Sequence, residues 1–384
     1  MAGIRTLVSY NRIILPQRGC YGIYIFSVLT GTVSRRLDGR HLLSVLCKSF
    51  GKGMVISMTE KRKKSRKKYD ILRFALKCIC IPGAALMIIF LLNKSYRKID
   101  EGKYLDVAKF STLTAYEPEV RIGNLGSSHG AYDFNYNALT ERGFECFNFA
   151  NTSQSYNYDY AVLKEYGRYM TKGSVMFIPV SYFSFNNEVT NDSEREAMSL
   201  RYYHCLSPEN IPDYDLYIDI VAHRFPILSA GEDILELLPE LKLSLIVHAA
   251  EEEIDVAAFT ARAQERYSRH FDNKDEYFLP ERIEELYEII NYCKEREITP
   301  VLITTPFSKY YRDLVSEEFL TEFEDVVNKI AADTDVSYYD YSYDERFRGN
   351  LSYFMDADHL NDEGAAYFME ILAEEVPELK SLLS

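Results

Sequence analysis

The chain has 384 residues, of which 44 are lysine or arginine, 58 are aspartate or glutamate and 47% are hydrophobic. This composition excludes collagen, a coiled coil and a wholly disordered chain, and seven cysteines are too few for a scaffold built from disulfides. The charge is divided, because residues 1–98 carry 20 basic and 3 acidic side chains while residues 99–384 carry 24 and 55. The acidic part is a poor nucleic-acid binder, since phosphate contacts need clustered basic residues. We therefore expect two parts that lie in different environments.

The first part of the chain shows no clear hydrophobic period. Residues 1–53 are basic, and their apolar run Tyr21–Val33 is too short to span a membrane. Met54 and Met58 lie just before a basic cluster, where an anchored protein would naturally begin. We expect 1–53 to be an upstream extension or a disordered segment, and 54–70 to be a basic cytoplasmic segment.

A transmembrane anchor is predicted at residues 71–92. Lys61–Lys68 holds seven positive charges in eight residues, and the 22 residues Ile71–Leu92 that follow are mostly apolar. A helix of that length spans about 33 Å, which covers a hydrocarbon core of about 30 Å. The alternatives are a buried core helix and a cleaved signal peptide, although no Ala-x-Ala-like cleavage site follows Leu92. The positive-inside rule predicts a single-pass protein of the cell membrane, with a cytoplasmic N-terminus and an extracytoplasmic main domain after about Tyr96.

After a predicted linker at 93–117, the remaining chain, 118–384, alternates between short apolar runs and helical periodicity. The predicted strands are Val120–Leu125, Glu145–Ala150, Ser174–Ser181, Pro300–Thr305 and Val336–Tyr341, and the predicted helices are Asp159–Met170, Pro280–Arg296, Glu317–Ala332 and Asn361–Glu374. This alternation predicts a three-layer α/β/α fold with a parallel five-stranded sheet. Ligands of such sheets bind beyond the carboxyl ends of the strands.

Residues at about 184–280 interrupt the alternation. They contain helical stretches at Asp233–Ile246 and Glu251–Ser268 and a proline-marked loop at Ser207–Pro212, which predicts a helical insertion near the rim of the active site. The 31 tyrosines cluster at 155–160 and 338–341. Strand propensity and amphipathic surface explain such clusters, and rings that stack on sugars around a cleft are the alternative.

Two short motifs combine serine, aspartate and histidine. Ser128 lies in Gly126-Ser127-Ser128-His129-Gly130 between the first strand and a helix, where loop amides can stabilise an oxyanion. Asp356 and His359 form an Asp-x-x-His motif after the last strand. Because both motifs lie at the same sheet edge, we predict that Ser128 is a nucleophile, His359 its base and Asp356 the group that orients the imidazole.

The neighbours of these residues have other predicted roles. Asp356 is preferred over Asp358, because one turn of chain can return a residue three back to within about 7 Å. Asp358 is expected to be solvated or to face the substrate, and His129 to pack or cap at the start of its helix. Metal binding by Asp356, Asp358 and His359 is an alternative that lacks a second ligand cluster, so we expect no metal and no cofactor.

These motifs resemble those of the SGNH (GDSL-type) hydrolase superfamily, over about residues 118–375. The resemblance is to a membrane-anchored branch similar to the D-alanyl transfer protein of teichoic-acid modification and to polysaccharide O-acyltransferases. Gly126–His129 is similar to the Gly-Asp-Ser block with serine in place of aspartate, which implies that Ser128 is the nucleophile. In the middle blocks Ser153, near Asn151, stands where an oxyanion-hole glycine is expected, and Ser181 stands in for an asparagine donor. The resemblance thus implies Ser153, Asn151 and Ser181 as oxyanion or substrate contacts.

The glycine pattern around Ser128 also fits the Gly-x-Ser-x-Gly elbow of α/β-hydrolases. That fold places several strands before its elbow, and here the elbow follows the first strand of the domain. The SGNH resemblance implies extracytoplasmic transfer of a small acyl group to a cell-envelope polysaccharide or teichoic-acid-like polymer, with a membrane-bound O-acyltransferase as partner. The alternatives are an esterase or deacetylase that uses water as acceptor, and a non-catalytic, membrane-tethered glycan-binding protein.

Overall fold

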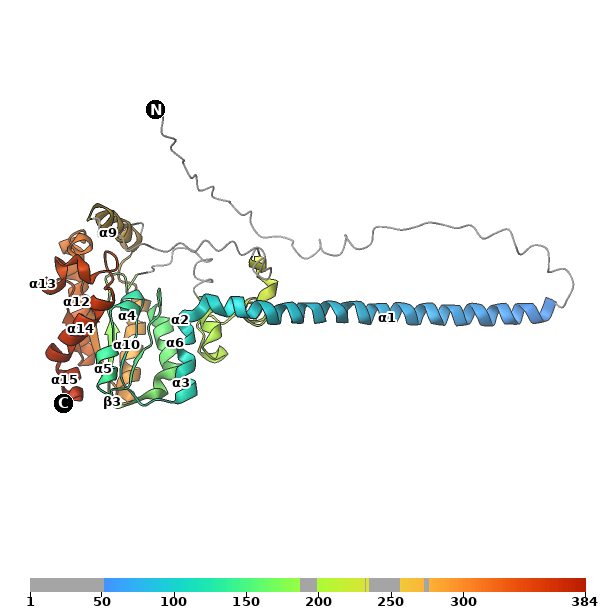
Figure 1. The fold of residues 1–384 in the computed structure, drawn as a ribbon, viewed down its shortest axis with the longest axis horizontal. Coiled ribbons are helices and arrows are strands. Elements are labelled where there is room, and N and C mark those ends of the chain that lie inside the picture. The colour runs from blue at the N-terminus through green and yellow to red at the C-terminus, as the bar shows by residue number, and fades with distance from the viewer. Residues whose placement is uncertain (1–51, 187–198, 232, 235–255, 273–275) are drawn as a thin grey trace, which may run out of the picture. The chain divides into compact units, whose positions relative to one another are not determined.

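The computed structural model describes residues 52–186, 199–231, 233–234, 256–272 and 276–384 (Figure 1). The chain divides into two compact units, Met1–Cys80 and Ile81–Ser384. In the first unit, the described residues form the beginning of helix α1, which runs over Lys52–Glu101. The upstream extension predicted at 1–53 lies outside the described residues except for its last two positions.

Helix α1 contains the predicted anchor. Among the described residues it is the one helix that is long and apolar enough to cross a membrane, and its apolar window is fully exposed. Side chains such as Phe74, Ile79 and Leu86 expose two thirds or more of their surface. An uncovered apolar helix of this length is compatible with a single membrane span, and it is not a buried core helix.

The second unit is built on a parallel sheet. Within the described residues, its strands are β1 (Val120–Asn124), β2 (Cys146–Asn148), β3 (Met170–Pro179), β4 (Thr299–Thr304) and β5 (Ser337–Asp340). They form one five-stranded sheet in the order β2-β1-β3-β4-β5, with every neighbouring pair parallel. This flavodoxin-like order confirms the predicted fold class. Because the strand order reverses between β1 and β3, a ligand crevice is expected beyond the carboxyl ends of these two strands.

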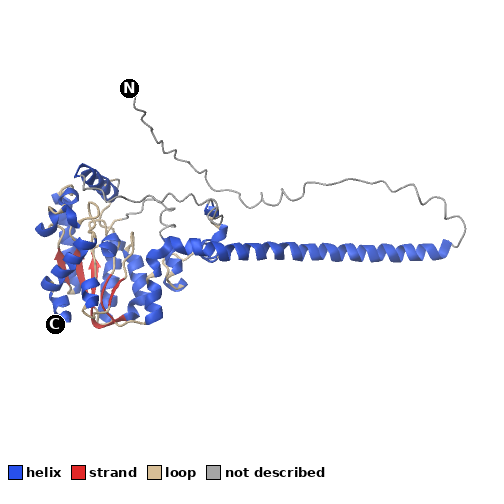
Figure 2. Ribbon diagram, viewed as in Figure 1, coloured by secondary structure: helices blue, strands red, loops and turns tan. Residues whose placement is uncertain are grey.

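Helices cover both faces of the sheet (Figure 2). On one face, α10 (Pro280–Glu295) packs against α6 (Tyr156–Tyr166) and α12 (Glu317–Thr334). On the other face, α14 (Asp362–Glu375) packs against α15 (Pro377–Leu383), which contacts β3. The shorter helices are η2 (Gly102–Tyr104), α2 (Leu105–Ala108), α3 (Phe110–Tyr116), α4 (Ser128–Tyr132), α5 (Asn137–Glu141), η3 (Gly167–Tyr169), η4 (Arg201–His204), η5 (Pro208–Asn210), α8 (Leu216–Ile218), η6 (Asp219–Arg224), η7 (Pro226–Leu228), α11 (Lys309–Arg312), α13 (Glu345–Arg348) and η10 (Leu351–Tyr353).

Local sequence explains most of these boundaries. Strand β4 is a continuous apolar run that is buried along nearly its whole length, as expected for a strand covered on both faces. Helix α14 begins where the side chain of Asn361 accepts a hydrogen bond from the backbone N–H of Gly364 at 2.9 Å. Strand β3 begins at Met170, four residues before the predicted start, because Met170 pairs with Val120. The register between β1 and β3 then shifts, and pairing resumes with Val175 opposite Ile122.

Two segments outside the alternating strands and helices were predicted as a linker and as an insertion. The predicted linker at 93–117 is helical, and Val107, Phe110 and Leu113 belong to the core of the domain. In the insertion, helix α9 (Val256–Phe271) corresponds to the helix predicted from residue 251, and it packs against α11. The other helix predicted there, Asp233–Ile246, lies outside the described residues from 235 onward.

Candidate active site

The turn between β1 and α4 presents Ser128 as the first residue of the helix. Gly126 adopts a φ of +113°, which L side chains rarely adopt, and an added Cβ there would meet the ring of Pro179 at 3.1 Å. The backbone N–H of Gly126 donates to the buried carboxylate of Asp159 at 2.8 Å. At Gly130 a Cβ would lie 2.2 Å from the carbonyl oxygen of Leu125, so only glycine lets the helix return so close to the strand. These constraints fix the position of the Ser128 hydroxyl, which is half-buried.

The structure brings His359 and Asp356 to this serine across 231 residues of sequence. The Nε2 atom of His359 lies 2.7 Å from Ser128 Oγ, and its Nδ1 atom lies 2.8 Å from Asp356 Oδ2. An ionised carboxylate can only accept, so Nδ1 carries the proton and Nε2 accepts from the serine hydroxyl. The three predicted residues therefore form a continuous Ser–His–Asp hydrogen-bonded chain.

The loop that carries His359 is held from several sides. Asp356 Oδ1 accepts the backbone N–H of His359 at 3.0 Å, which closes the turn of chain expected between these two residues. The backbone N–H of Leu360 donates to the buried carboxylate of Asp133 at 2.8 Å. An isolated pairing joins Phe354 and Leu360 on either side of the loop. The imidazole is thus fixed through its own backbone as well as through its ring.

Asp358 does not face solvent, and the expectation that it would is wrong. Its side chain is fully buried and receives a two-pronged ion pair from Arg266 of α9, with Nε at 2.9 Å from Oδ1 and Nη2 at 2.9 Å from Oδ2. Burial alone would raise the pKa of Asp358, but the neighbouring His359, His129 and Arg266 hold it well below its usual range. A guanidinium from a distant helix, 92 residues away in sequence, explains why the loop turns this carboxylate inward.

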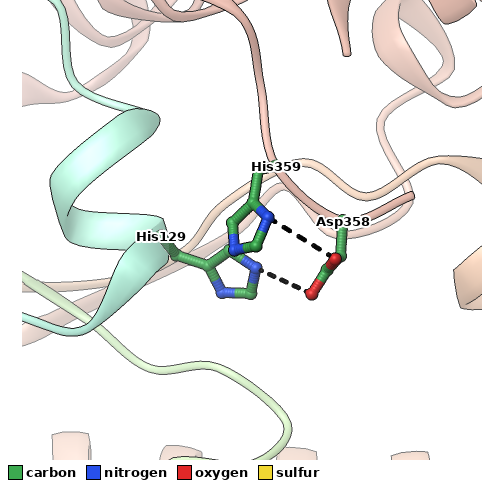
Figure 3. A group of neighbouring side chains, drawn as sticks. All are labelled: His129, Asp358 and His359. Atoms are coloured by element: carbon green, nitrogen blue, oxygen red, sulfur yellow. Dashed lines mark ion pairs between the residues drawn. The ribbon is translucent and has the colours of Figure 1, made fainter. Parts of the chain in front are cut away.

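Asp358 lies beside two neighbouring histidine rings, those of His129 and His359 (Figure 3). Its carboxylate is 3.6 Å from Nδ1 of His359 and 3.5 Å from Nε2 of His129. Burial disfavours the charged form of His359, but Asp358 and Asp356 together outweigh it and raise the pKa of the imidazole. Burial lowers the pKa of His129, whose ring is enclosed by aromatic side chains and is fully buried. His129 therefore packs at the start of its helix, as predicted.

The same three residues are the group in the described part of the chain whose ligand atoms lie close enough to hold a metal ion, within 4.8 Å of one another. Several of their polar atoms are already engaged by protein partners, although Nε2 of His129 has no hydrogen-bond partner. Arg266 binds both oxygens of Asp358, and Nδ1 of His129 lies 2.5 Å from the hydroxyl of Ser181. A cation would have to displace the guanidinium, so the group fits a buried ion-pair network better than a metal site.

The three residues expected to contact the oxyanion or the substrate have different surroundings. Ser181 is buried, with its hydroxyl on His129, and the side-chain amide of Asn151 donates to Gln154 at 2.8 Å. Ser153 is half-buried and lines a cavity that begins at Gly126. Its φ of +57° is the left-handed conformation that glycine favours, at the position where the family resemblance expects glycine. Ser153 is thus the one of the three that lines this cavity.

The cavity has a volume of about 490 Å³. It extends from the turn before Ser128 to the segment Asp215–Ile218, and its walls combine aromatic and polar groups. Its aromatic lining residues are Tyr156, Tyr158, Phe183, Tyr203 and Tyr217. Part of the first predicted tyrosine cluster therefore surrounds a cleft, whereas Tyr338 and Tyr339 of the second lie in β5, where their hydroxyls bond to Thr304 and Glu378.

Sequence reasoning missed three residues of the site, namely Arg266, Asp133 and Asp159. Burial raises the pKa of Asp133 to about 8 and that of Asp159 to about 7, and both carboxylates accept backbone N–H groups beside the Ser–His–Asp chain. Arg266 and Asp159 lie within predicted helices, and Asp133 lies just after the Ser128 turn. A single charged residue at such a position forms no sequence motif. Only the folded arrangement shows that they hold the two loops of the site.

Comparison with known proteins adds little to this geometry. No protein-family model and no curated protein matches the sequence. Among solved structures, the chain is similar to one from Streptococcus pneumoniae named for platelet activating factor, with 13% identity and a TM-score of 0.36 over 79% of this chain and 99% of that one. A Bacteroides fragilis protein named as an acylhydrolase has 12% identity and a TM-score of 0.36 over 72% and 97%, and an acetyl xylan esterase has 11% and 0.33 over 67% and 100%. At these scores the likenesses carry no weight for the activity, which rests on the site itself.

Proposed function

We propose that the chain is a membrane-tethered serine acyltransferase that acts outside the cytoplasm. The observation that carries the proposal is the hydrogen-bonded chain from Ser128 Oγ through His359 to Asp356, with contacts of 2.7 and 2.8 Å. This is the arrangement that activates a serine for nucleophilic attack on an acyl group. A glycan-binding protein without activity would not require a serine, a histidine and an aspartate joined by hydrogen bonds in this order.

The chemistry follows from the donor and acceptor roles. Ser128 Oγ attacks the carbonyl carbon of an acyl donor while His359 Nε2 takes its proton, and Asp356 stabilises the imidazolium that forms. When the tetrahedral intermediate collapses, the leaving group departs with the proton from His359 and an ester remains on Ser128. An acceptor hydroxyl then gives its proton to His359 and attacks that ester. When this second tetrahedral intermediate collapses, His359 passes the proton to Ser128 Oγ, and the acylated acceptor leaves. A backbone N–H at Ser153 is the proposed oxyanion donor, because that residue lines the adjoining cavity.

The acceptor is proposed to be a hydroxyl of a cell-envelope polysaccharide or a teichoic-acid-like polymer. A cavity of about 490 Å³ with tyrosine rings and polar side chains is suited to a sugar unit, which offers both an apolar ring face and hydroxyls. The apolar helix α1 would hold this site beside the membrane. The proposed acyl supplier is a membrane-bound O-acyltransferase, and the proposed acyl group is acetyl or another small acyl.

The same site would be an esterase if water took the place of the acceptor hydroxyl. The purified full-length protein should therefore be supplied with p-nitrophenyl acetate, with and without an N-acetylglucosamine oligomer. We expect acetylated oligomer by mass spectrometry, at the expense of free acetate. Release of acetate at an unchanged rate, with no acetylated oligomer, would assign hydrolysis. Absence of both products from a protein that still binds the oligomer would favour the non-catalytic alternative.

A further inference from the structure

Helix α1 becomes covered by the folded domain at the point where its apolar run ends. Residues 63–88 are exposed, whereas Asn93, Tyr96 and Asp100 are buried and Ile89 is half-buried. These four positions share one face of a helix, since they are three or four residues apart. The covered face therefore starts within one turn of Leu92, the last residue of the apolar run.

At Asn93 the cover comes from residues 216–228, which comprise α8, η6 and η7 and are called the collar here. The side-chain amide of Asn93 donates to the carbonyl oxygen of Arg224 at 2.9 Å, and its oxygen accepts the backbone N–H of Ile227 at 3.3 Å. Arg97 Nη2 donates to the same carbonyl of Arg224 at 3.0 Å. The collar, yellow-green in Figure 1, is thus fixed to α1 by directional bonds to a residue adjacent to Leu92.

The level of the collar follows from helix geometry. A helix rises about 1.5 Å per residue, so Asn93 lies only that far along the axis from the end of the apolar run. The headgroup region adds roughly 5–7 Å on each side of the hydrocarbon core. A collar bonded to Asn93 on a membrane-spanning α1 therefore lies at the headgroup level.

The collar exposes apolar side chains that the fold leaves uncovered. Leu216, Tyr217, Ile220 and Leu228 expose 62%, 72%, 42% and 52% of their surface. Basic residues accompany them on the adjoining turns of α1, where Lys94, Arg97 and Lys98 are exposed. Exposed leucine, isoleucine and tyrosine beside lysine and arginine is the composition of protein surfaces that lie in a membrane interface.

We propose that the collar is a membrane-contact surface, whose apolar side chains enter the interface of a phospholipid bilayer while the nearby cations meet lipid phosphates. The proposal rests on α1 as a membrane span and not on the activity of Ser128. It has a consequence for substrate supply, because Tyr217 and Ile218 of the collar also line the cavity beside the Ser128 turn. A collar seated on the bilayer opens that cavity toward molecules held at the membrane surface.

The chain contains no tryptophan, so a single introduced tryptophan is a unique fluorophore. Three full-length variants, Tyr217→Trp, Leu228→Trp and the control Tyr116→Trp, should be reconstituted in liposomes of phosphatidylcholine and phosphatidylglycerol. Tyr116 is 81% exposed, but it ends α3 just before β1 and so lies at the amino edge of the sheet, whereas Tyr217 lines the cavity at the carboxyl edge.

Lipids brominated near the top of the acyl chain should quench the fluorescence of Tyr217→Trp and Leu228→Trp and shift their emission to the blue, and should leave Tyr116→Trp unchanged. Equal, weak quenching of all three variants would overturn the proposal. A blue shift at positions 217 and 228 without quenching by brominated lipid would also overturn it, because a protein partner or a second copy would then cover the collar. Melting temperatures close to that of the parent protein establish that each variant is folded.

Discussion

Two carboxylates flank the imidazole of His359, and the structure gives them different tasks. Asp356 lies 2.8 Å from Nδ1 and keeps more than a quarter of its side chain exposed, whereas Asp358 is fully buried, 3.6 Å from Nδ1, and paired with Arg266. One carboxylate orients the ring by a direct hydrogen bond. The other supplies a fixed negative charge whose own position depends on a partner in the insertion.

Replacing each aspartate by alanine should separate these tasks. Asp356→Ala removes the orienting bond, so we expect kcat/KM to fall by about 10³–10⁴-fold with a modest loss of stability. Asp358→Ala leaves Arg266 without its buried partner and should lower the free energy of unfolding by about 3 kcal/mol. Urea unfolding and kcat/KM, measured at equal folded fraction, check both. A larger loss of activity from Asp358→Ala than from Asp356→Ala would reverse the assignment.

The pH dependence of the reaction should report the charge of Asp358. The pKa of His359 is raised above its ordinary value of 6.5, and the base must be neutral to accept a proton, so kcat/KM should fall as the pH drops through that raised pKa. Asp358→Asn removes the carboxylate that contributes most to the rise, and the ascending limb should move to lower pH. The exposed Asp362, replaced by asparagine, is the matched control and should leave the limb in place. An unmoved limb in Asp358→Asn would show that this carboxylate does not tune the base.

At the scale of elements, helix α9 completes the site from within the insertion. Arg266 reaches Asp358 with two nitrogens, and its Nη2 lies 3.4 Å from His359 Nε2. The helix therefore contributes a positioning residue to a loop near the end of the chain. Activity should depend on the insertion even though Ser128, Asp356 and His359 all lie outside it.

Arg266→Gln tests this dependence. The guanidinium lies 3.4 Å from His359 Nε2, so its loss removes a like charge from beside the imidazolium, while His359 and His129 still hold the pKa of Asp358 below its usual range. We expect a fall in kcat and a shift of the ascending pH limb to higher values, with partial recovery in Arg266→Lys. Arg269→Gln replaces an exposed arginine of the same helix and should change neither. A fall in kcat with an unshifted pH profile would indicate a purely structural role.

The sheet could be predicted from the sequence, because buried parallel strands are continuous apolar runs and each is followed by a helical period. The Ser128 turn and the Asp356–His359 spacing were also visible, since each is a local pattern. The partners of Asp358 were not, because Arg266 lies 92 residues away in a segment without alternation. Chain spacing alone predicted that Asp358 faces outward. Its buried position depends on the ion pair with Arg266, which is a tertiary contact. The start of β3 was missed because Met170 pairs with Val120 ahead of a register shift, and the polar residues between Met170 and Val175 form no apolar pattern.

At the scale of the whole molecule, the basic and acidic parts of the chain lie on opposite sides of the exposed apolar stretch of α1. Seven positive charges precede Ile71–Leu92, and the domain that follows is strongly acidic. The positive-inside rule then predicts that a protease added to intact cells digests the chain after about Tyr96 and spares the basic cluster. Antibodies against each part, with permeabilised cells as the control, would detect the fragments. Protection of the large domain in intact cells would contradict the orientation.

The central claim is that Ser128 is an activated nucleophile, and covalent labelling tests it most directly. The full-length protein should be treated with a fluorophosphonate and the labelled peptide identified by mass spectrometry. We expect the label on Ser128, its loss in Ser128→Ala and in His359→Ala, and its retention in Ser127→Ala, the adjacent serine of the same turn. Undiminished labelling of Ser128→Ala, or a label that maps to another serine in the parent protein, would contradict the account.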